Sequence, residues 1–169
     1  MPRAKVKPKH QRDYKVSDSR EQDLEGLYEL AKFVLESKSI NLKYKKETLD
    51  WILWKVTEID GKENTRYRSE QALITNEKIN HEHVVTKRFL VEKLIEFPDM
   101  YKEILESAIA CIVTEDEHKN KLSKVKNLEG WERYKNAEVD VIDMANGRKV
   151  NLEQLISQQK SILDKLNCK

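Results

Sequence analysis

Residues 109–118 read Ile-Ala-Cys-Ile-Val-Thr-Glu-Asp-Glu-His, and this stretch decides the fold. Its first half, 109–113, is a short apolar run that is typical of a buried strand. Thr114 followed by Glu117 has the capping-box pattern of a helix start, and acidic residues in the first turn suit the positive end of a helix. The sequence therefore predicts a strand that passes directly into a helix, with His118 just beyond the first helical turn.

A second candidate strand lies upstream at 81–86, where the sequence is His-Glu-His-Val-Val-Thr. Its two consecutive valines favour a strand. Between the two strands, apolar residues at helical spacing predict one helix over 88–96 and another over 99–108. We therefore expect segment 79–124 to run strand, helical insert, strand, helix.

Further helices are predicted on both sides of this segment. Apolar residues recur at helical spacing in four places, 19–37, 46–57, 128–137 and a last helix that starts at Asn151. Ser19-x-x-Gln22 offers a capping box for the first helix, and Asn146-Gly147 predicts a two-residue turn between short strands. The expected fold class is α+β and predominantly helical.

Length and composition indicate one domain with a charged exterior. The chain has 169 residues, of which 38% are hydrophobic and 37% charged, which suits a packed core rather than a disordered chain. No apolar run approaches the roughly 20 residues that span a bilayer, and the N-terminus has no secretory pattern. Cys111 and Cys168 form no disulfide framework. We expect a cytoplasmic protein with no membrane partner.

The positive charge gathers at the N-terminus, although the formal net charge is only +2. Six basic side chains stand against Asp13 alone in the first 15 residues: Arg3, Lys5, Lys7, Lys9, Arg12 and Lys15. A flexible basic arm at 1–16, followed by a single domain at 17–169, suits a polyanionic partner. A solvated tail that aids solubility is the alternative. Within the domain we distinguish a helical part at 17–78, a core at 79–124 and a helix-hairpin-helix part at 125–169.

Three of the four histidines lie close together in the sequence, at 81, 83 and 118. Glu82 separates the first two on the upstream strand, and His118 lies on the helix that follows the downstream strand. Histidine titrates near neutral pH, and both histidine and glutamate bind metal ions. This is the chain's one concentration of residues suited to catalysis.

These residues resemble the HNH, or ββα-metal, endonuclease family. The first motif of that family is an acidic residue or histidine followed directly by the catalytic histidine at a strand, and Glu82-His83-Val84-Val85 looks like it. The last motif is a strand followed by a helix with a metal-binding histidine, which residues 110–119 resemble. The likeness covers about 79–124. It implies a ββα-metal core with a helical insert and flanking helices, and hydrolysis of phosphodiester bonds, mostly in DNA.

The resemblance also implies roles for individual residues. His83 would be the general base, while Glu82 and His118 would hold a divalent Mg, Mn or Zn ion that stabilises the phosphorane and the leaving oxygen. In a regular strand Glu82 and His83 point to opposite faces, so His81, which shares a face with His83, competes as a metal ligand.

Basic residues near both motifs would support the phosphates electrostatically: Lys87, Arg88 and Lys119. DNA is the expected partner. A homodimer suits an enzyme that cuts both strands, because two-fold symmetry matches the duplex.

The sequence departs from the family pattern and leaves alternatives open. Where the family usually has a bracing asparagine before the second strand, the sequence reads Glu106-Ser107-Ala108, and Thr86 replaces a common proline. The histidines could be ordinary surface residues, or could join Cys111 in a structural zinc site. The main alternative function is a non-catalytic helical module that binds nucleic acid or another protein.

Overall fold

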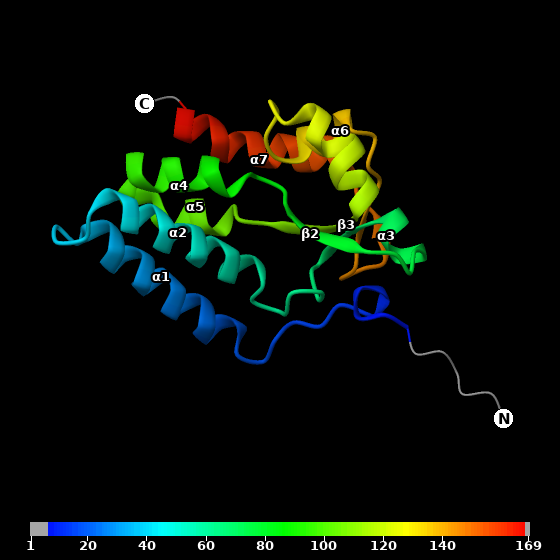
Figure 1. Cartoon of the computed structure of the whole chain (residues 1–169), viewed down its shortest axis with the longest axis horizontal. Helices are drawn as coiled ribbons and strands as arrows, with labels where there is room; N and C mark the ends of the chain where they lie inside the picture. The colour runs from blue at the N-terminus through cyan, green and yellow to red at the C-terminus, as the bar shows by residue number, and fades with distance from the viewer. Residues whose placement is uncertain (1–6, 168–169) are drawn as a thin grey trace.

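The computed structural model describes residues 7–167, without the side chains of 162, 163 and 165–167. The expected α+β class, mostly helical, is confirmed. Figure 1 shows helices α1, α2, α4 and α5 grouped at one end, with the sheet toward the other end and α3 and α6 near it. The helices are α1 (Arg20–Glu36), α2 (Leu42–Thr57), α3 (Glu70–Ile74), α4 (Lys87–Glu96), α5 (Tyr101–Glu106), α6 (Trp131–Asn136) and α7 (Leu152–Asn167).

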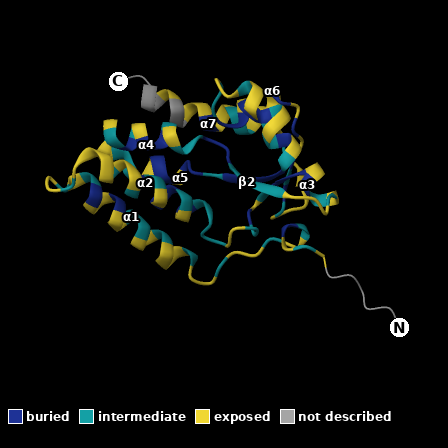
Figure 2. Ribbon diagram, in the orientation of Figure 1, coloured by how far each residue is buried: buried dark blue, intermediate teal, exposed yellow. Residues whose placement is uncertain are grey.

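The strands form one five-stranded sheet in the order β2-β3-β1-β4-β5. Only the β1–β3 pair is parallel, and the other neighbours are antiparallel. The strands are β1 (Tyr67–Ser69), β2 (Ile79–His83), β3 (Ala110–Thr114), β4 (Val141–Asp143) and β5 (Arg148–Lys149). Strand β3 is buried along its whole length, as its apolar run predicts, while β2 forms one edge of the sheet (Figure 2).

Two hydrophobic cores hold the helices and the sheet together. The first joins α1, α2, α4 and α5, and the second joins the sheet to α6 and to the described part of α7. Val84 and Val85, which follow β2, are both fully buried, Val84 in the second core and Val85 in the first. Each contributes about 1.5–3 kcal/mol by burial. The end of β2 is thus fixed from both sides.

The predicted strand-to-helix junction after β3 is confirmed in detail. Thr114 Oγ1 accepts a hydrogen bond from the Glu117 amide (3.1 Å), and the Glu117 carboxylate accepts one from the Thr114 amide (2.9 Å). Ser69 Oγ, from β1, also donates to this carboxylate (2.6 Å). The capping box therefore forms. The segment that follows is a wide helical turn of π type, η3 (Glu117–Lys121), and His118 lies on it.

Some sequence-based boundaries were wrong, each for a local reason. Strand β2 covers 79–83 rather than 81–86, because Thr86 Oγ1 instead accepts from the Phe89 amide and caps α4. Ser19 makes no capping bond for α1, since its hydroxyl donates to the Asp23 carboxylate (2.6 Å). Strand β1 was not predicted at all, because its sequence Tyr-Arg-Ser is polar although Arg68 is fully buried.

The N-terminal segment from residue 7 onward contacts the body of the molecule. Buried Arg68 donates from Nη1 to the backbone carbonyls of His10 (2.7 Å) and Arg12, and Asp60 accepts from the Tyr14 hydroxyl (2.7 Å). Arg3 and Lys5 of the expected arm, like Cys168, lie outside the described residues. Across 7–167, we find no helix with the length and apolar character needed to cross a bilayer.

Candidate functional site

The pleat of β2 sends neighbouring side chains to opposite faces of the sheet. Each residue of β2 has a partner in β3, from Ile79 opposite Thr114 to His83 opposite Ala110. The strand is therefore regular, without a bulge, and its side chains alternate. His81 and His83 lie on one face and Glu82 on the other, so the two faces of β2 form separate environments.

On one face, Glu82 joins the two halves of the sequence pattern. Its Oε2 accepts a hydrogen bond from His118 Nδ1 at 2.6 Å, although the two residues are 36 positions apart in the chain. Its Oε1 contacts the guanidinium of Arg133, which comes from α6 and is almost fully buried. We refer to Glu82, His118 and Arg133 as the carboxylate cluster.

The carboxylate cluster is reachable from solvent through His118. The His118 side chain is 44% exposed, whereas that of Glu82 is 13% and that of Arg133 is 5% exposed. Because a carboxylate oxygen accepts, Nδ1 of His118 carries the proton. In the neutral ring, Nε2 is then left with a free lone pair that can bind a metal ion or accept a proton.

On the opposite face, the two other histidines are enclosed by helix α2. His81 Nε2 and His83 Nε2 lie 3.1 and 3.2 Å from Thr57 Oγ1, and both rings lie about 5.5 Å from the ring of Trp54. His81 Nδ1 also donates to the carbonyl of Lys62 (2.9 Å). Thr57 Oγ1 donates its one proton to the Trp54 carbonyl (2.8 Å), so a ring that bonds Oγ1 must donate to it. A neutral His81 that donates from Nδ1 has no proton on Nε2, and the donor is therefore His83. We call the side chains of His81, His83, Thr57 and Trp54 the histidine pocket.

Burial keeps the rings of the histidine pocket neutral. Desolvation lowers the pKa of His83 to about 3, and the positive charges of Lys87 and Arg133, and the one that His81 would carry if protonated, act in the same direction. The pKa of His81 is also lowered, mainly by desolvation. A ring that is buried, neutral and hydrogen-bonded to Thr57 is poorly placed to take a proton from an attacking water.

The three predicted phosphate-binding cations lie apart and each has a carboxylate partner. Lys87 on α4 bonds Asp50 (2.6 Å) and lies over Trp54, on the side of the histidine pocket. Arg88 pairs with Glu92 (3.2 Å) on the exposed side of α4. Lys119 follows His118 directly and bonds Glu115 (2.6 Å). Only Lys119 is adjacent in the chain to a member of the carboxylate cluster.

Arg133 belongs to the site, although sequence reasoning assigned it no role. It lies on α6 between Trp131 and Tyr134, which are both buried. A basic residue on a buried turn needs a charged partner, because an unpaired buried charge is very costly. That signal was present in the sequence Trp-Glu-Arg-Tyr, but nothing in the spacing indicated that the partner would be Glu82.

The cluster has two residues of metal-binding type, Glu82 and His118, but the bond from His118 Nδ1 to Glu82 leaves only Nε2 free, on the side of the ring that faces away from the carboxylate. Among the described residues, no group of three or more histidine, cysteine, aspartate or glutamate side chains lies together. A catalytic zinc ion usually has three protein ligands, so a single free donor suits it poorly. Magnesium commonly keeps several waters and binds substrate phosphates, and a site with few protein donors fits that habit better.

A structural zinc site is not assembled by the residues suggested for it. His81 and His83 contact Thr57, His118 contacts Glu82 on the other face, and Cys111 lies buried in β3. Burial raises the pKa of the Cys111 thiol well above its ordinary value, which disfavours the thiolate that zinc requires.

Comparison of the chain with protein-family models, with curated proteins and with solved structures finds no match.

Proposed function

We propose that the protein is a divalent-metal-dependent phosphodiester hydrolase of the HNH type, acting on nucleic acid, with Glu82 and His118 at its centre. The observation that carries the proposal is the 2.6 Å contact between these side chains. They come from the two half-motifs that resemble the family, and the order β2, helical insert, β3, helical turn is the one that the resemblance implies.

In this proposal His118 binds the ion through Nε2, Glu82 orients the His118 ring through its Nδ1 proton, and Arg133 fixes Glu82. Arg133 is buried and bonds the second carboxylate oxygen, so Glu82 has little freedom to rotate. His118 lies at the solvent-facing side, where a phosphate group can approach. A divalent cation would offset the charge that develops on the phosphate and lower the pKa of an attacking water.

The surroundings of His83 do not favour it as the general base. The resemblance assigns the proton to His83, but its ring lies on the face opposite Glu82 and contacts Thr57. We therefore base the proposal on Glu82 and His118 and treat His83 as a residue that fixes β2 against α2. DNA remains the proposed substrate, on the resemblance alone.

The test is a nicking assay on supercoiled plasmid with Mg²⁺ or Mn²⁺, with EDTA as the metal control. We expect the wild type to nick in a metal-dependent way and Glu82→Gln and His118→Ala to lose nicking. The matched controls are Glu92→Gln, an exposed carboxylate that pairs with Arg88 on α4, and Asn120→Ala on η3, whose side chain bonds Asp116. No nicking by folded wild type with either metal would refute the proposal.

A non-catalytic nucleic-acid-binding module is the second candidate, and one observation favours it. The Glu82 carboxylate already has two partners, His118 and Arg133, as a purely structural ion network would. In that case the wild type would bind nucleic acid without nicking it. Glu82→Gln would then lower the free energy of unfolding and change nothing else.

A further inference from the structure

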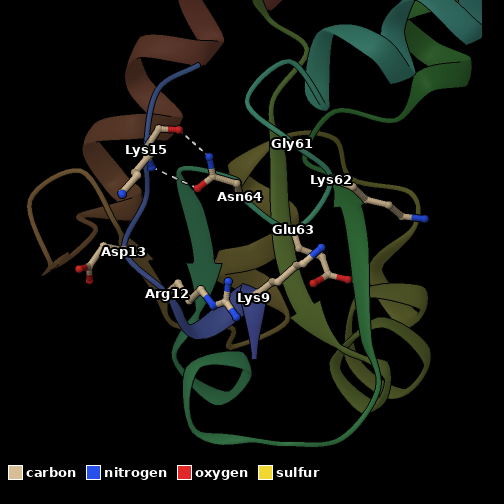
Figure 3. A pocket seen from close by; sticks show the side chains of 8 residues that line it. All are labelled: Lys9, Arg12, Asp13, Lys15, Gly61, Lys62, Glu63 and Asn64. Atoms are coloured by element: carbon tan, nitrogen blue, oxygen red, sulfur yellow. Dashed lines mark hydrogen bonds between the residues drawn. The ribbon is translucent and has the colours of Figure 1, made fainter. Parts of the chain in front are cut away.

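Two hollows in the surface meet at the turn formed by Gly61 and Lys62, which line both of them. The first, of about 690 Å³, lies between the N-terminal segment and this turn, and Figure 3 shows its lining side chains. The second, of about 730 Å³, lies between α1 and α2 and includes Trp51. Residues of the carboxylate cluster line neither hollow, so this surface is separate from the proposed catalytic centre.

The first hollow carries an excess of positive charge. Four cations line it against two carboxylates: Lys9, Arg12, Lys15 and Lys62 against Asp13 and Glu63. Within the described residues, none of these four cations forms an ion pair. By contrast, the three cations predicted to bind phosphate, on α4 and η3, each have a carboxylate partner. Cations that no carboxylate neutralises are the groups that bind phosphates with release of counterions.

The walls of this hollow are held in place by hydrogen bonds to the body of the protein. Arg68 is fully buried in β1 and donates to the carbonyls of His10 and Arg12, within the basic segment. Asn64 accepts from the Lys15 amide (3.1 Å), the contact drawn in Figure 3. The basic segment therefore has a fixed backbone on the body of the protein. A fixed backbone lowers the entropy lost when a ligand binds.

The second hollow offers an aromatic surface. Trp51 on α2 is 48% exposed, and the Lys55 ammonium lies 5.9 Å from the centre of its ring. Gly26 on α1 also lines this hollow, and no atom lies within 4 Å of where its Cβ would be. The space there is open to a flat group. Asp23 and Glu58 balance Lys55 and Lys62 in this hollow, and Lys55 pairs with Glu58 (3.5 Å), so the attraction for an unpaired base comes from stacking on the exposed ring.

We infer that the two hollows form one binding track for single-stranded nucleic acid, with the phosphates along the basic hollow and a base on Trp51. Lys62 joins the two parts. A duplex offers phosphates but no free base face, so the exposed indole favours a single strand. The choice of nucleic acid as the ligand rests on the proposed function, whereas the binding itself needs neither Glu82 nor His118.

The test measures fluorescence anisotropy with labelled dT20, rU20 and a 20-base-pair duplex, in EDTA so that no cleavage occurs. We expect a single strand to bind more tightly than the duplex. Trp51→Leu should weaken single-strand binding at least about fivefold. The Arg12→Ala, Lys62→Ala double variant should lower the slope of log affinity against log salt by about 1.4. The aromatic control is Tyr44→Leu, exposed on the same helix, and the charge control is Lys32→Ala, Lys46→Ala.

The outcomes separate this inference from the proposed function. Equal effects of the test and control variants, or tighter binding of the duplex, would overturn the binding track even if the wild type nicks plasmid. Specific loss of binding in the test variants supports the track even if the wild type does not nick. Tryptophan fluorescence decides whether Trp51 itself is involved, because a stacked base should quench emission in Tyr44→Leu but much less in Trp51→Leu.

Discussion

The two faces of β2 show how differently one short strand can place similar residues. On one face, Glu82 meets a partly exposed histidine and a buried arginine. On the other, His81 and His83 are packed under Trp54 and against one threonine hydroxyl. The first face is charged and open, and the second is neutral and closed. Residues that are adjacent in sequence therefore differ in exposure, charge state and partners.

The difference teaches that a histidine-rich motif on a regular strand divides between two sites. The period of two in a strand decides which residues can act together, and sequence proximity does not. The three histidines that stand out in the sequence are therefore not one cluster in space. Glu82 lies between His81 and His83 in the sequence, but it bonds His118, which follows the helical insert and β3.

Removal of the carboxylate should give the largest effect. Glu82→Ala leaves Arg133 buried without a counter-charge, which should lower the free energy of unfolding by about 3–5 kcal/mol. Denaturant unfolding measures this loss. The control is Glu115→Ala, which removes a partly exposed ion pair with Lys119 and should cost under about 1 kcal/mol. Adding Arg133→Met should recover part of the loss. If Glu82→Ala lowers the free energy of unfolding no more than the control does, Glu82 does not neutralise a buried charge and the two faces of β2 do not differ in this respect.

His118 should matter for activity rather than for stability. His118→Ala is expected to lower the rate of metal-dependent nicking by about a hundredfold or more, since it removes a ligand of the proposed ion. Its side chain is 44% exposed, so the free energy of unfolding should change by under about 1 kcal/mol. Nicking rates and urea midpoints are to be compared with those of Asn120→Ala. Normal nicking by the His118 variant would refute the proposal that His118 binds the catalytic ion.

His83 should show the reverse pattern. His83→Gln disturbs the bond to Thr57 in a buried pocket and should cost about 1–3 kcal/mol of stability. Its nicking rate should fall less than about tenfold, whereas loss of a general base costs about 10²–10⁴. Thr57→Val, which removes the same bond without touching the ring, should have a similar effect on stability. A drop beyond a hundredfold in a folded His83→Gln protein would restore His83 as the base.

The closed face should also make stability depend on pH. The pKa of His83 is about 3 in the folded protein and near 6.5 when unfolded, so the unfolded chain binds more protons between these values. Stability should therefore fall as pH drops from about 6.5 toward 3, by up to about 1.4 kcal/mol per pH unit for this group. Urea unfolding in EDTA at several pH values measures the slope. His83→Phe should flatten it, and an unchanged slope would contradict the burial of a neutral ring.

How much the sequence could predict follows from the range of each interaction. The junction after β3 was predictable because the capping box is local, within four residues from Thr114 to Glu117. The wrong end of the upstream strand comes from a local competitor, the cap that Thr86 provides for α4, whereas the missed β1 depends on partners distant in sequence, the carbonyls that surround Arg68. The meeting of Glu82 with His118 was implied by the family resemblance alone. Its third member, Arg133, depends on how α6 packs, and no local pattern encodes that.

The smallest expected effect comes from two surface cations, which test whether the substrate lies on the side of His118 or on the side of α4. Lys119 follows His118 and pairs with Glu115, while Arg88 lies on α4 with Glu92 and is 89% exposed. If phosphates approach the carboxylate cluster, Lys119→Ala should lower nicking about twofold to fivefold and weaken its salt dependence, because one phosphate contact is lost. Arg88→Ala should change neither. Nicking rates at two salt concentrations measure both variants, and a larger effect at Arg88 would place the substrate beside α4, away from His118.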